Sequence, residues 1–199
     1  DTRAGSWITA PAFLGYSTVD SGGGAWVDLN VWLTDCLFLF NDAGWNGGGI
    51  DVESGDLTMV GTDFISNTCG NYGGGAHAYL DADLTDGSFV GNEAEGYGGG
   101  LYLYQALRAS GTQFIRNWTA GYGGGVFADG DTSLSGLLFD DNYARDGEGG
   151  GIYVDAGSLF ITSTQFISNY AGYYGGGANI YQGDTSLVER IRRPGAGRK

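Results

Sequence analysis

The triplet Gly22-Gly23-Gly24 begins a pattern that runs through the whole chain. The same Gly-Gly-Gly returns at residues 47–49, 73–75, 98–100, 123–125, 149–151 and 175–177. Successive triplets are separated by 25, 26, 25, 25, 26 and 26 residues. A period held to within one residue is the signature of a repeat architecture, in which each repeat buries its apolar face against its neighbours.

A short alternating run follows each triplet, as in Leu101-Tyr102-Leu103-Tyr104. Apolar residues at every second position, bounded by glycines, predict a strand with one buried face. A second strand is predicted to end in a Phe-x-x-Asn motif, whose copies are Phe38 and Asn41, Phe64 and Asn67, Phe89 and Asn92, Phe114 and Asn117, Phe139 and Asn142, and Phe166 and Asn169. No part of the repeat has the periodicity of a helix.

Such strands, stacked in register, predict an all-β protein: a parallel β-helix, or solenoid, of about seven coils of 25–26 residues. Equivalent residues then stack, Phe on Phe in the core and Asn on Asn at a bend, where side-chain amides form a hydrogen-bonded ladder. Glycine permits a turn too tight for a Cβ atom. We expect the β-helix domain to span residues 1–188 and a basic tail to occupy residues 189–199.

Composition and charge exclude several classes of protein. The hydrophobic content of 42% is too high for a disordered glycine-rich linker, and the absence of a Gly-X-Y period excludes collagen. The net charge is −14, divided into −18 for residues 1–188 and +4 for residues 189–199. An acidic body repels nucleic acid and anionic membranes, so we expect neither as a partner.

The sequence carries no secretory signal and no apolar run of membrane length, so we expect no membrane insertion. It starts at Asp1 without a methionine, as processed, exported proteins do, and Lys199 is its single lysine. These features favour an extracellular or cell-surface location.

The pairing of Gly-Gly-(Ala/Ile/Leu/Val) with Phe-x-x-Asn, from about Phe13 to Ile180, resembles the repeats of polymorphic outer-membrane proteins and related bacterial surface β-helix proteins. The resemblance implies a right-handed parallel β-helix of the kind found on exported surface adhesins and autotransporter passengers. Pectin-lyase-like enzymes share the architecture, so the fold alone leaves the function open.

The repeat pattern begins and ends partway through a coil, and no cap is recognisable at either end. Open β-helix ends expose unpaired strand edges, which favour assembly. We therefore expect a homo-oligomer that stacks end to end into a fibre, with its basic tail on the acidic surface of the next copy. The residues predicted to self-associate are Trp7, Ile8, Phe13, Ala178, Ile180, Leu187, Arg190, Arg192 and Arg193.

Aromatic residues recur at outward positions and define a surface aromatic stripe: Tyr72, Tyr97, Tyr102, Tyr104, Tyr122, Phe127, Tyr153 and Tyr174. Stacked rings ~4.8 Å apart on a rigid face are able to bind glycans or a lateral partner. Same-face ring pairs also stabilise a sheet by themselves, at ~0.2–1 kcal/mol per pair. The sequence is compatible with both roles.

We expect no enzymatic activity. The only candidate carboxylate pair for glycoside hydrolysis is Asp140 and Asp141, and adjacent strand residues face opposite ways. Asp140 interrupts an apolar column and suggests a local bend or an outward turn. The single histidine, His77, is expected at an outward position without a partner.

An ice-binding face is a further alternative, because ice-binding solenoids display regular Thr-x-Thr arrays. One hydroxyl column contains Thr9, Thr34, Thr85, Ser110, Ser135 and Thr162, and a second column two residues later contains Thr62, Thr112 and Thr164. Only Thr162 and Thr164 complete the motif. High β-propensity of threonine also explains such columns.

No metal and no cofactor are expected, because the acidic residues do not recur in every coil and no Gly-Gly-x-Gly-x-Asp calcium repeat is present. Cys36 and Cys69 occupy different columns, which predicts free thiols rather than a disulfide. Asn117 begins an N-glycosylation motif, but its place in the Asn ladder predicts a buried side chain.

Overall fold

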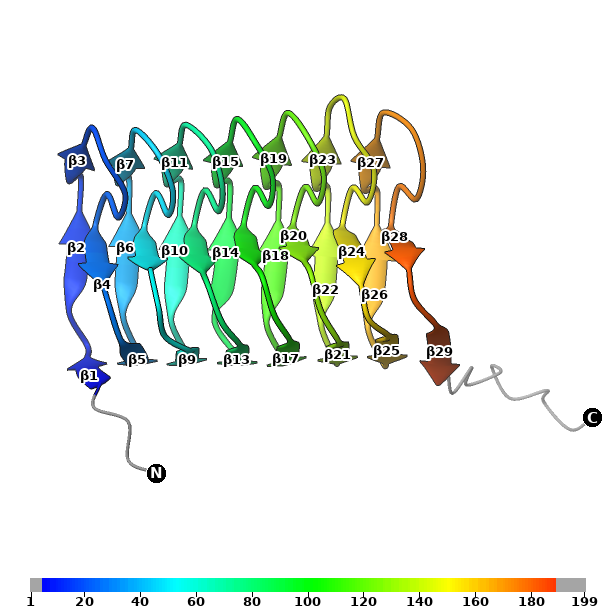
Figure 1. The fold of residues 1–199 in the computed structure, drawn as a ribbon, viewed down its shortest axis with the longest axis horizontal. Coiled ribbons are helices and arrows are strands. Elements are labelled where there is room, and N and C mark those ends of the chain that lie inside the picture. Colours follow the sequence, from blue (N-terminus) through cyan, green and yellow to red (C-terminus); the bar gives the residue numbers. More distant parts are fainter. Residues whose placement is uncertain (1–4, 189–199) are drawn as a thin grey trace, which may run out of the picture.

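The computed structural model describes residues 5–188, with side chains described as far as Asp184. These residues form a parallel β-helix in which every strand belongs to one of four parallel sheets, and they include no helix (Figure 1). Accordingly, the described part of the chain offers no helical segment able to cross a membrane. The all-β solenoid predicted from the repeat is confirmed.

Sheets A and B form the floor and one wall of the coil. Sheet A consists of β1 (Gly5–Thr9), β5 (Asn30–Thr34), β9 (Leu57–Val60), β13 (Ala82–Thr85), β17 (Leu107–Ser110), β21 (Thr132–Ser135), β25 (Leu159–Thr162) and β29 (Thr185–Val188). Sheet B consists of β2 (Ala12–Leu14), β6 (Leu37–Leu39), β10 (Asp63–Ile65), β14 (Ser88–Val90), β18 (Gln113–Ile115), β22 (Leu138–Asp140) and β26 (Gln165–Ile167).

Sheets C and D complete each coil on either side of the glycine triplet. Sheet C consists of β3 (Ser17–Thr18), β7 (Asp42–Ala43), β11 (Thr68–Cys69), β15 (Glu93–Ala94), β19 (Trp118–Thr119), β23 (Tyr143–Ala144) and β27 (Tyr170–Ala171). Sheet D consists of β4 (Ala25–Val27), β8 (Ile50–Val52), β12 (Ala76–Ala78), β16 (Leu101–Leu103), β20 (Val126–Ala128), β24 (Ile152–Ala156) and β28 (Ala178–Gln182).

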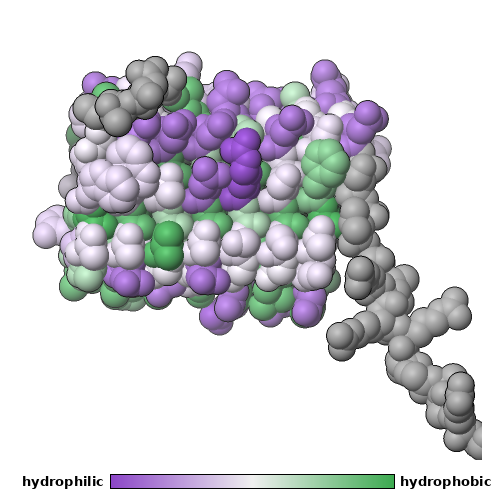
Figure 2. Space-filling model, turned by 90° about the horizontal axis from the view of Figure 1, so that it is seen from below, coloured by the Kyte–Doolittle hydropathy of each residue, from purple (hydrophilic) through white to green (hydrophobic). Residues whose placement is uncertain are grey.

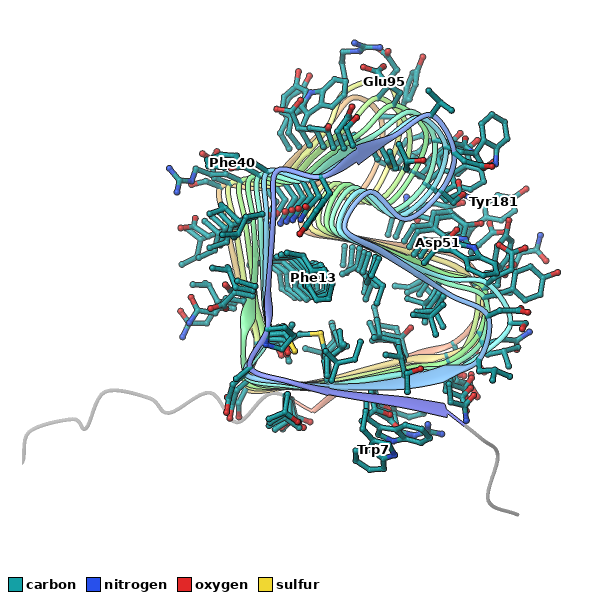
Figure 3. All side chains as sticks on the ribbon, turned by 90° about the vertical axis from the view of Figure 1, so that its left-hand side faces the viewer. Trp7, Phe13, Phe40, Asp51, Glu95 and Tyr181 are labelled. Atoms are coloured by element: carbon teal, nitrogen blue, oxygen red, sulfur yellow. The ribbon has the colours of Figure 1, made fainter. Side chains whose placement is uncertain are left out.

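The coils are right-handed. Seen from the N-terminal end, the chain runs clockwise as it recedes from the viewer (Figure 3). Each coil contributes one strand to each of the four sheets, which is more than the two or three short strands per coil that the sequence pattern suggested. The segment ending in Phe-x-x-Asn divides into a sheet A strand and a sheet B strand, because the backbone turns through a left-handed conformation between them, as at Asp35 with φ 51° and Asp86 with φ 55°.

A column of phenylalanine rings fills the interior. Phe13, Phe38, Phe64, Phe89, Phe114, Phe139 and Phe166 stack with centroid separations of 4.5, 4.6, 4.8, 4.8, 5.0 and 4.8 Å. Figure 3 shows these rings lying one behind another inside the coil. The predicted Phe-on-Phe stacking is therefore confirmed, and it gives every coil the same apolar contact with its neighbours.

The asparagines form the predicted ladder at the bend after sheet B. Asn41, Asn67, Asn92 and Asn117 each donate a side-chain hydrogen bond to the Oδ1 atom of the asparagine in the following coil, at 2.9–3.0 Å. Each also donates to the carbonyl of a phenylalanine in the preceding coil, as Asn92 does to Phe64 at 2.9 Å. The ladder thus satisfies buried backbone groups at a corner where no strand pairing can do so.

The glycine triplets pack backbone against backbone. A Cβ atom on Gly99 would lie 2.4 Å from the carbonyl oxygen of Trp118 and 2.5 Å from that of Gly124. The first glycine of each triplet has a positive φ, for example 64° at Gly98. Both facts require glycine, as the sequence pattern predicted.

The local bend or outward turn predicted at Asp140 is not present, so this prediction is wrong. Asp140 ends β22 in regular register with Ile115 on one side and Ile167 on the other. It belongs to the outward, half-buried column of sheet B, where a charged side chain reaches water without bending the strand.

Candidate functional site

The surface aromatic stripe predicted from the sequence is partly buried. Tyr102, Phe127 and Tyr153 lie on the outer face of sheet D, yet they are only 4%, 6% and 6% exposed. Tyr72 and Tyr122, from the turns before the glycine triplets, cover them, with ring centroids 4.6 Å from Tyr102 and 4.9 Å from Tyr153. The expectation of exposure is wrong for these three rings because the turns fold back over the sheet.

The remaining members of the stripe differ in exposure. Tyr72, Tyr97, Tyr104 and Tyr122 are half-buried, whereas Tyr174 is 70% exposed. The buried rings stack face to face, as Tyr102 does on Phe127 at 4.7 Å and 6°. A ring whose faces are covered by other rings has no face left for a sugar. The stripe is therefore best read as a stabilising cluster.

Burial also affects the tyrosine hydroxyls of this cluster. Loss of solvent raises the pKa of Tyr102, and its hydrogen bond with Tyr104 acts in the same direction. The pKa of Tyr153 is raised first by burial and then by the carboxylate of Asp155, whose Oδ1 lies 3.2 Å from the Tyr153 hydroxyl. These hydroxyls therefore stay protonated at neutral pH and act as hydrogen-bond donors.

His77 is not an outward residue without a partner. It is 3% exposed, and its Nδ1 lies 2.5 Å from Oδ1 of Asp51, which is fully buried. His77 Nε2 and Asp51 Oδ2 have no hydrogen-bond partner among the described protein atoms. The pair occupies the sheet D column that holds Tyr102 in the next coil, and the 26-residue spacing of Asp51 and His77 could have revealed it.

The candidate carboxylates Asp140 and Asp141 line a shallow concavity of about 510 Å³ together with Ile115, Arg116 and Ser168. Asp140 is half-buried and Asp141 is exposed, with a φ of 55°. The carboxylates are thus brought near a guanidinium on an open corner of the coil. Such a corner binds solvent readily and does not exclude it from a reacting group.

The outer face of sheet A holds the first hydroxyl column. Thr85, Ser110, Ser135 and Thr162 are aligned by the strand register and exposed. The second hydroxyl column, however, turns inward, since Thr62 and Thr112 are fully buried. The paired Thr-x-Thr array considered for ice binding is therefore not formed.

A different row accompanies the hydroxyl column on this face. Two residues before each position of the hydroxyl column, in which Val60 replaces a hydroxyl in one coil, lie the outward side chains Trp7, Trp32, Thr58, Asp83, Arg108, Ser133 and Phe160. Figure 2 shows this face, where side chains of intermediate hydropathy run along the coils beside more hydrophilic ones. Between the two rows lies a groove of about 460 Å³. The sequence pattern did not reveal it, because the row that begins with Trp7 mixes aromatic, polar and charged side chains.

Of the residues predicted to self-associate, Trp7 and Ile8 lie in β1, Phe13 lies in β2, and Ala178 and Ile180 lie in β28, the last strand of sheet D. Ile8, Phe13, Ala178 and Ile180 are partly buried against the core, while Trp7 is 74% exposed. Leu187 belongs to β29, whose side chains are not described. Arg190, Arg192 and Arg193, with the whole proposed tail, lie outside the described residues.

Cys36 and Cys69 are buried free cysteines in separate apolar clusters. Asn117 is fully buried and both its amide hydrogens are engaged, so the glycosylation motif is inaccessible in the fold. Within the part of the chain that the structure describes, no three His, Cys, Asp or Glu side chains converge as metal ligands would.

The geometry defines a parallel β-helix repeat protein, and a family comparison agrees. Residues 136–155 match the Chlamydia polymorphic membrane protein repeat. This segment contains one complete set of the features that recur throughout the chain: Phe139, Asn142, the triplet of residues 149–151 and Ile152. The match points to an outer-membrane or surface-associated protein. Neither a curated protein nor a solved structure matches the chain.

Proposed function

We propose that this chain is the rigid β-helix region of an adhesin-type protein on the cell surface. The observation that carries the proposal is the match of residues 136–155 to a surface-protein repeat. The same Phe, Asn and Gly columns continue through the other coils, so the character of the matched repeat extends along the rod. A stack of identical contacts holds lateral side chains at fixed spacing for binding.

Antibody labelling of the cells that produce the protein tests the location. Intact cells should be labelled as strongly as permeabilised cells, and brief protease treatment of intact cells should remove the label. Labelling only after permeabilisation would contradict surface exposure. Adhesion is tested separately with beads that carry the purified chain, which should bind target cells more than beads carrying a heat-unfolded control.

We also infer that the chain self-associates end to end. Successive coils meet through the same contacts, including ring stacking of 4.5 Å between Phe13 and Phe38 and parallel pairing of β1 with β5. A coil of a second copy can make these contacts equally well, since the repeat is complementary to itself.

Electron microscopy and light scattering at increasing concentration test the self-association. Rods that lengthen with concentration are expected, and removal of residues 189–199 should shorten them if the basic tail contacts the acidic body. Monodisperse monomers at high concentration would refute the inference. Rods of unchanged length after the deletion would show that the tail does not contribute to self-association.

We further propose that the chain is not an enzyme. The reason is the open setting of Asp140 and Asp141, which provides no water-excluding cleft. Incubation with a panel of polysaccharides should release no reducing ends. Release that disappears in the D140N/D141N double variant would overturn this. Carbohydrate binding without cleavage remains the second candidate function, and the groove on sheet A favours it.

A further inference from the structure

We propose that the groove on sheet A is a binding site for a neutral oligosaccharide. The groove crosses β13, β17, β21 and β25, and its polar rim consists of Asp83, Arg108, Ser133, Thr85, Ser110, Ser135 and Thr162. The inference rests on the proposed surface function in one respect only, because the surface location determines where the ligand comes from. The site itself follows from the side chains that the coil register brings together.

The shape of the groove comes from side-chain size. The parallel register places Arg108 beside Ser133 and Ser133 beside Phe160 in one row, and Ser110, Ser135 and Thr162 in the other. Short serine side chains therefore lie between a long arginine and a phenylalanine, and the surface is hollow there. The resulting volume of about 460 Å³ lies in the range of small-ligand sites.

The groove supplies an apolar contact of the kind that sugars require. Phe160 is 46% exposed although it lies on a sheet. Among the described rings it stacks on no other, in contrast to the outward pair Tyr143 and Tyr170, whose centroids lie 4.7 Å apart at 11°. An unstacked ring keeps its electron-rich face available for the C–H groups of a pyranose.

The same groove offers hydrogen-bonding groups of both kinds. Nη1 of Arg108 lies 3.6 Å from Oδ1 of Asp83, so donors and an acceptor stand side by side. The guanidinium donates and the carboxylate accepts, while Ser110 and Ser135 do both. Adjacent hydroxyls of a sugar ring present the complementary set of donors and acceptors.

Charge selects a neutral ligand. Arg108 is the basic residue of the groove, and it lies near two carboxylates, Asp83 and Asp81, at 3.6 and 4.0 Å. The body of the protein is strongly acidic as well. A uronate, a sulfated glycan or a nucleic acid would therefore be repelled, whereas a neutral sugar would not.

The length of the groove suits a short oligosaccharide. Four coils at ~4.8 Å per step span ~14 Å from first to last strand. A sugar residue in an extended chain has a length close to one coil step. Successive sugars can therefore meet equivalent rim positions in successive coils.

The test is calorimetry and glycan-array binding of the full chain with neutral trisaccharides (cellotriose, maltotriose, laminaritriose, mannotriose and chitotriose) and with trigalacturonate as the acidic comparison. At least one neutral trisaccharide should bind, and trigalacturonate should bind more weakly or not at all. Phe160→Ala should weaken binding by about tenfold or more, which corresponds to ~1.4 kcal/mol. Arg108→Ala should also weaken it.

Ile167→Ala is the matched control, because Ile167 is 45% exposed on the neighbouring sheet B and does not line the groove. The Ile167→Ala variant should bind the neutral trisaccharide with the same affinity as the unmodified chain. Circular dichroism verifies that each variant is folded, and Ser135→Trp, which fills the groove without removing a core contact, provides a second way to abolish binding.

Three results would overturn the proposal: no binding of any neutral trisaccharide, stronger binding of trigalacturonate, or equal affinity in the Phe160→Ala, Ser135→Trp and control variants. Each leaves the antibody labelling of intact cells unaffected. Failure of the sugar site is thereby distinguished from failure of the proposed surface function.

Discussion

Asn117 shows how much of this fold depends on single side chains. Its Oδ1 accepts hydrogen bonds from the backbone N–H and the amide of Asn92, both at 3.0 Å, and its amide donates to Phe89 and to Asn142, both at 2.9 Å. Asn117→Ala would leave several buried groups without partners, each costing ~1–3 kcal/mol. We expect the free energy of unfolding to fall by about 3 kcal/mol or more.

Chemical denaturation of Asn117→Ala measures this loss. Gln113→Ala, at an exposed position of the same coil, is the control and should change stability by less than about 0.5 kcal/mol. Equal stability of the two variants would show that the Asn ladder does not stabilise the fold.

Cys69 should be almost unreactive in the native protein. Burial raises the pKa of its thiol to about 12, and burial also raises that of Cys36. Because only the thiolate reacts, alkylation of Cys69 at pH 8 should be slower than that of an ordinary thiol by about a thousandfold or more. Iodoacetamide labelling followed by mass spectrometry measures the rate.

The denatured chain is the control, since both thiols should then be alkylated quickly. Rapid modification of Cys69 under native conditions would mean that the coil opens locally around β11 far more often than its burial suggests.

Asp51 and His77 depend on each other. Asp51→Ala would leave the buried ring of His77 without its hydrogen-bond partner, and a buried polar group left unpaired in this way costs ~1–3 kcal/mol. Adding His77→Phe should recover part of the loss, because Phe replaces the ring with an apolar one like Phe127 in the same column.

Thermal unfolding of Asp51→Ala, His77→Phe and the double variant completes the cycle that measures the coupling. A double variant no more stable than Asp51→Ala alone would show that the unpaired histidine is not the source of the loss.

At the scale of the element, the glycine turns set the distance between coils. A methyl group on Gly99 would collide with the carbonyls of Trp118 and Gly124, which are backbone atoms that cannot rotate away. Gly99→Ala should therefore destabilise the protein by about 3 kcal/mol or more.

Gly136→Ala separates this effect from backbone strain. Gly136 has a φ of 71°, but a Cβ atom there would meet nothing within 4 Å. Its substitution should lower the free energy of unfolding by only ~1 kcal/mol, because alanine adopts the left-handed conformation less readily than glycine does. Similar losses in the two variants, measured by urea denaturation, would contradict the steric role of the triplet.

The elements were predictable where a residue meets its own equivalent in the next coil. Phe89 on Phe114 and Asn92 on Asn117 are such contacts, so their spacing in the sequence sufficed. The division of the second predicted strand was not predictable, because it depends on a left-handed residue that is aspartate in some coils, as at Asp35, and has no constant signature.

At the scale of the whole molecule, like charge opposes the compact rod. Residues 1–188 carry a net charge of −18, and salt screens the repulsion between these like charges. Raising NaCl from about 0.01 M to about 1 M shortens the Debye length from ~30 to ~3 Å. We expect stability to rise by about 1 kcal/mol, or ~2–4 °C in Tm.

Scanning calorimetry at neutral pH measures the shift. The control is the same comparison near the isoelectric point of about 4.1, where net charge is small and the increase should vanish. A Tm at neutral pH that falls with salt would indicate that attractive ion pairs, rather than repulsion, dominate the surface.

The sequence by itself determined the coil: its period, its Phe core, its Asn ladder and its glycine turns all follow from contacts between equivalent residues 25 or 26 positions apart. Only the tertiary structure decided which outward columns are covered. Tyr102 is buried because a turn of the same solenoid folds over sheet D, and the sheet A groove is open because short serines lie between Arg108 and Phe160. Both outcomes depend on packing between non-equivalent residues, which a repeat pattern does not encode.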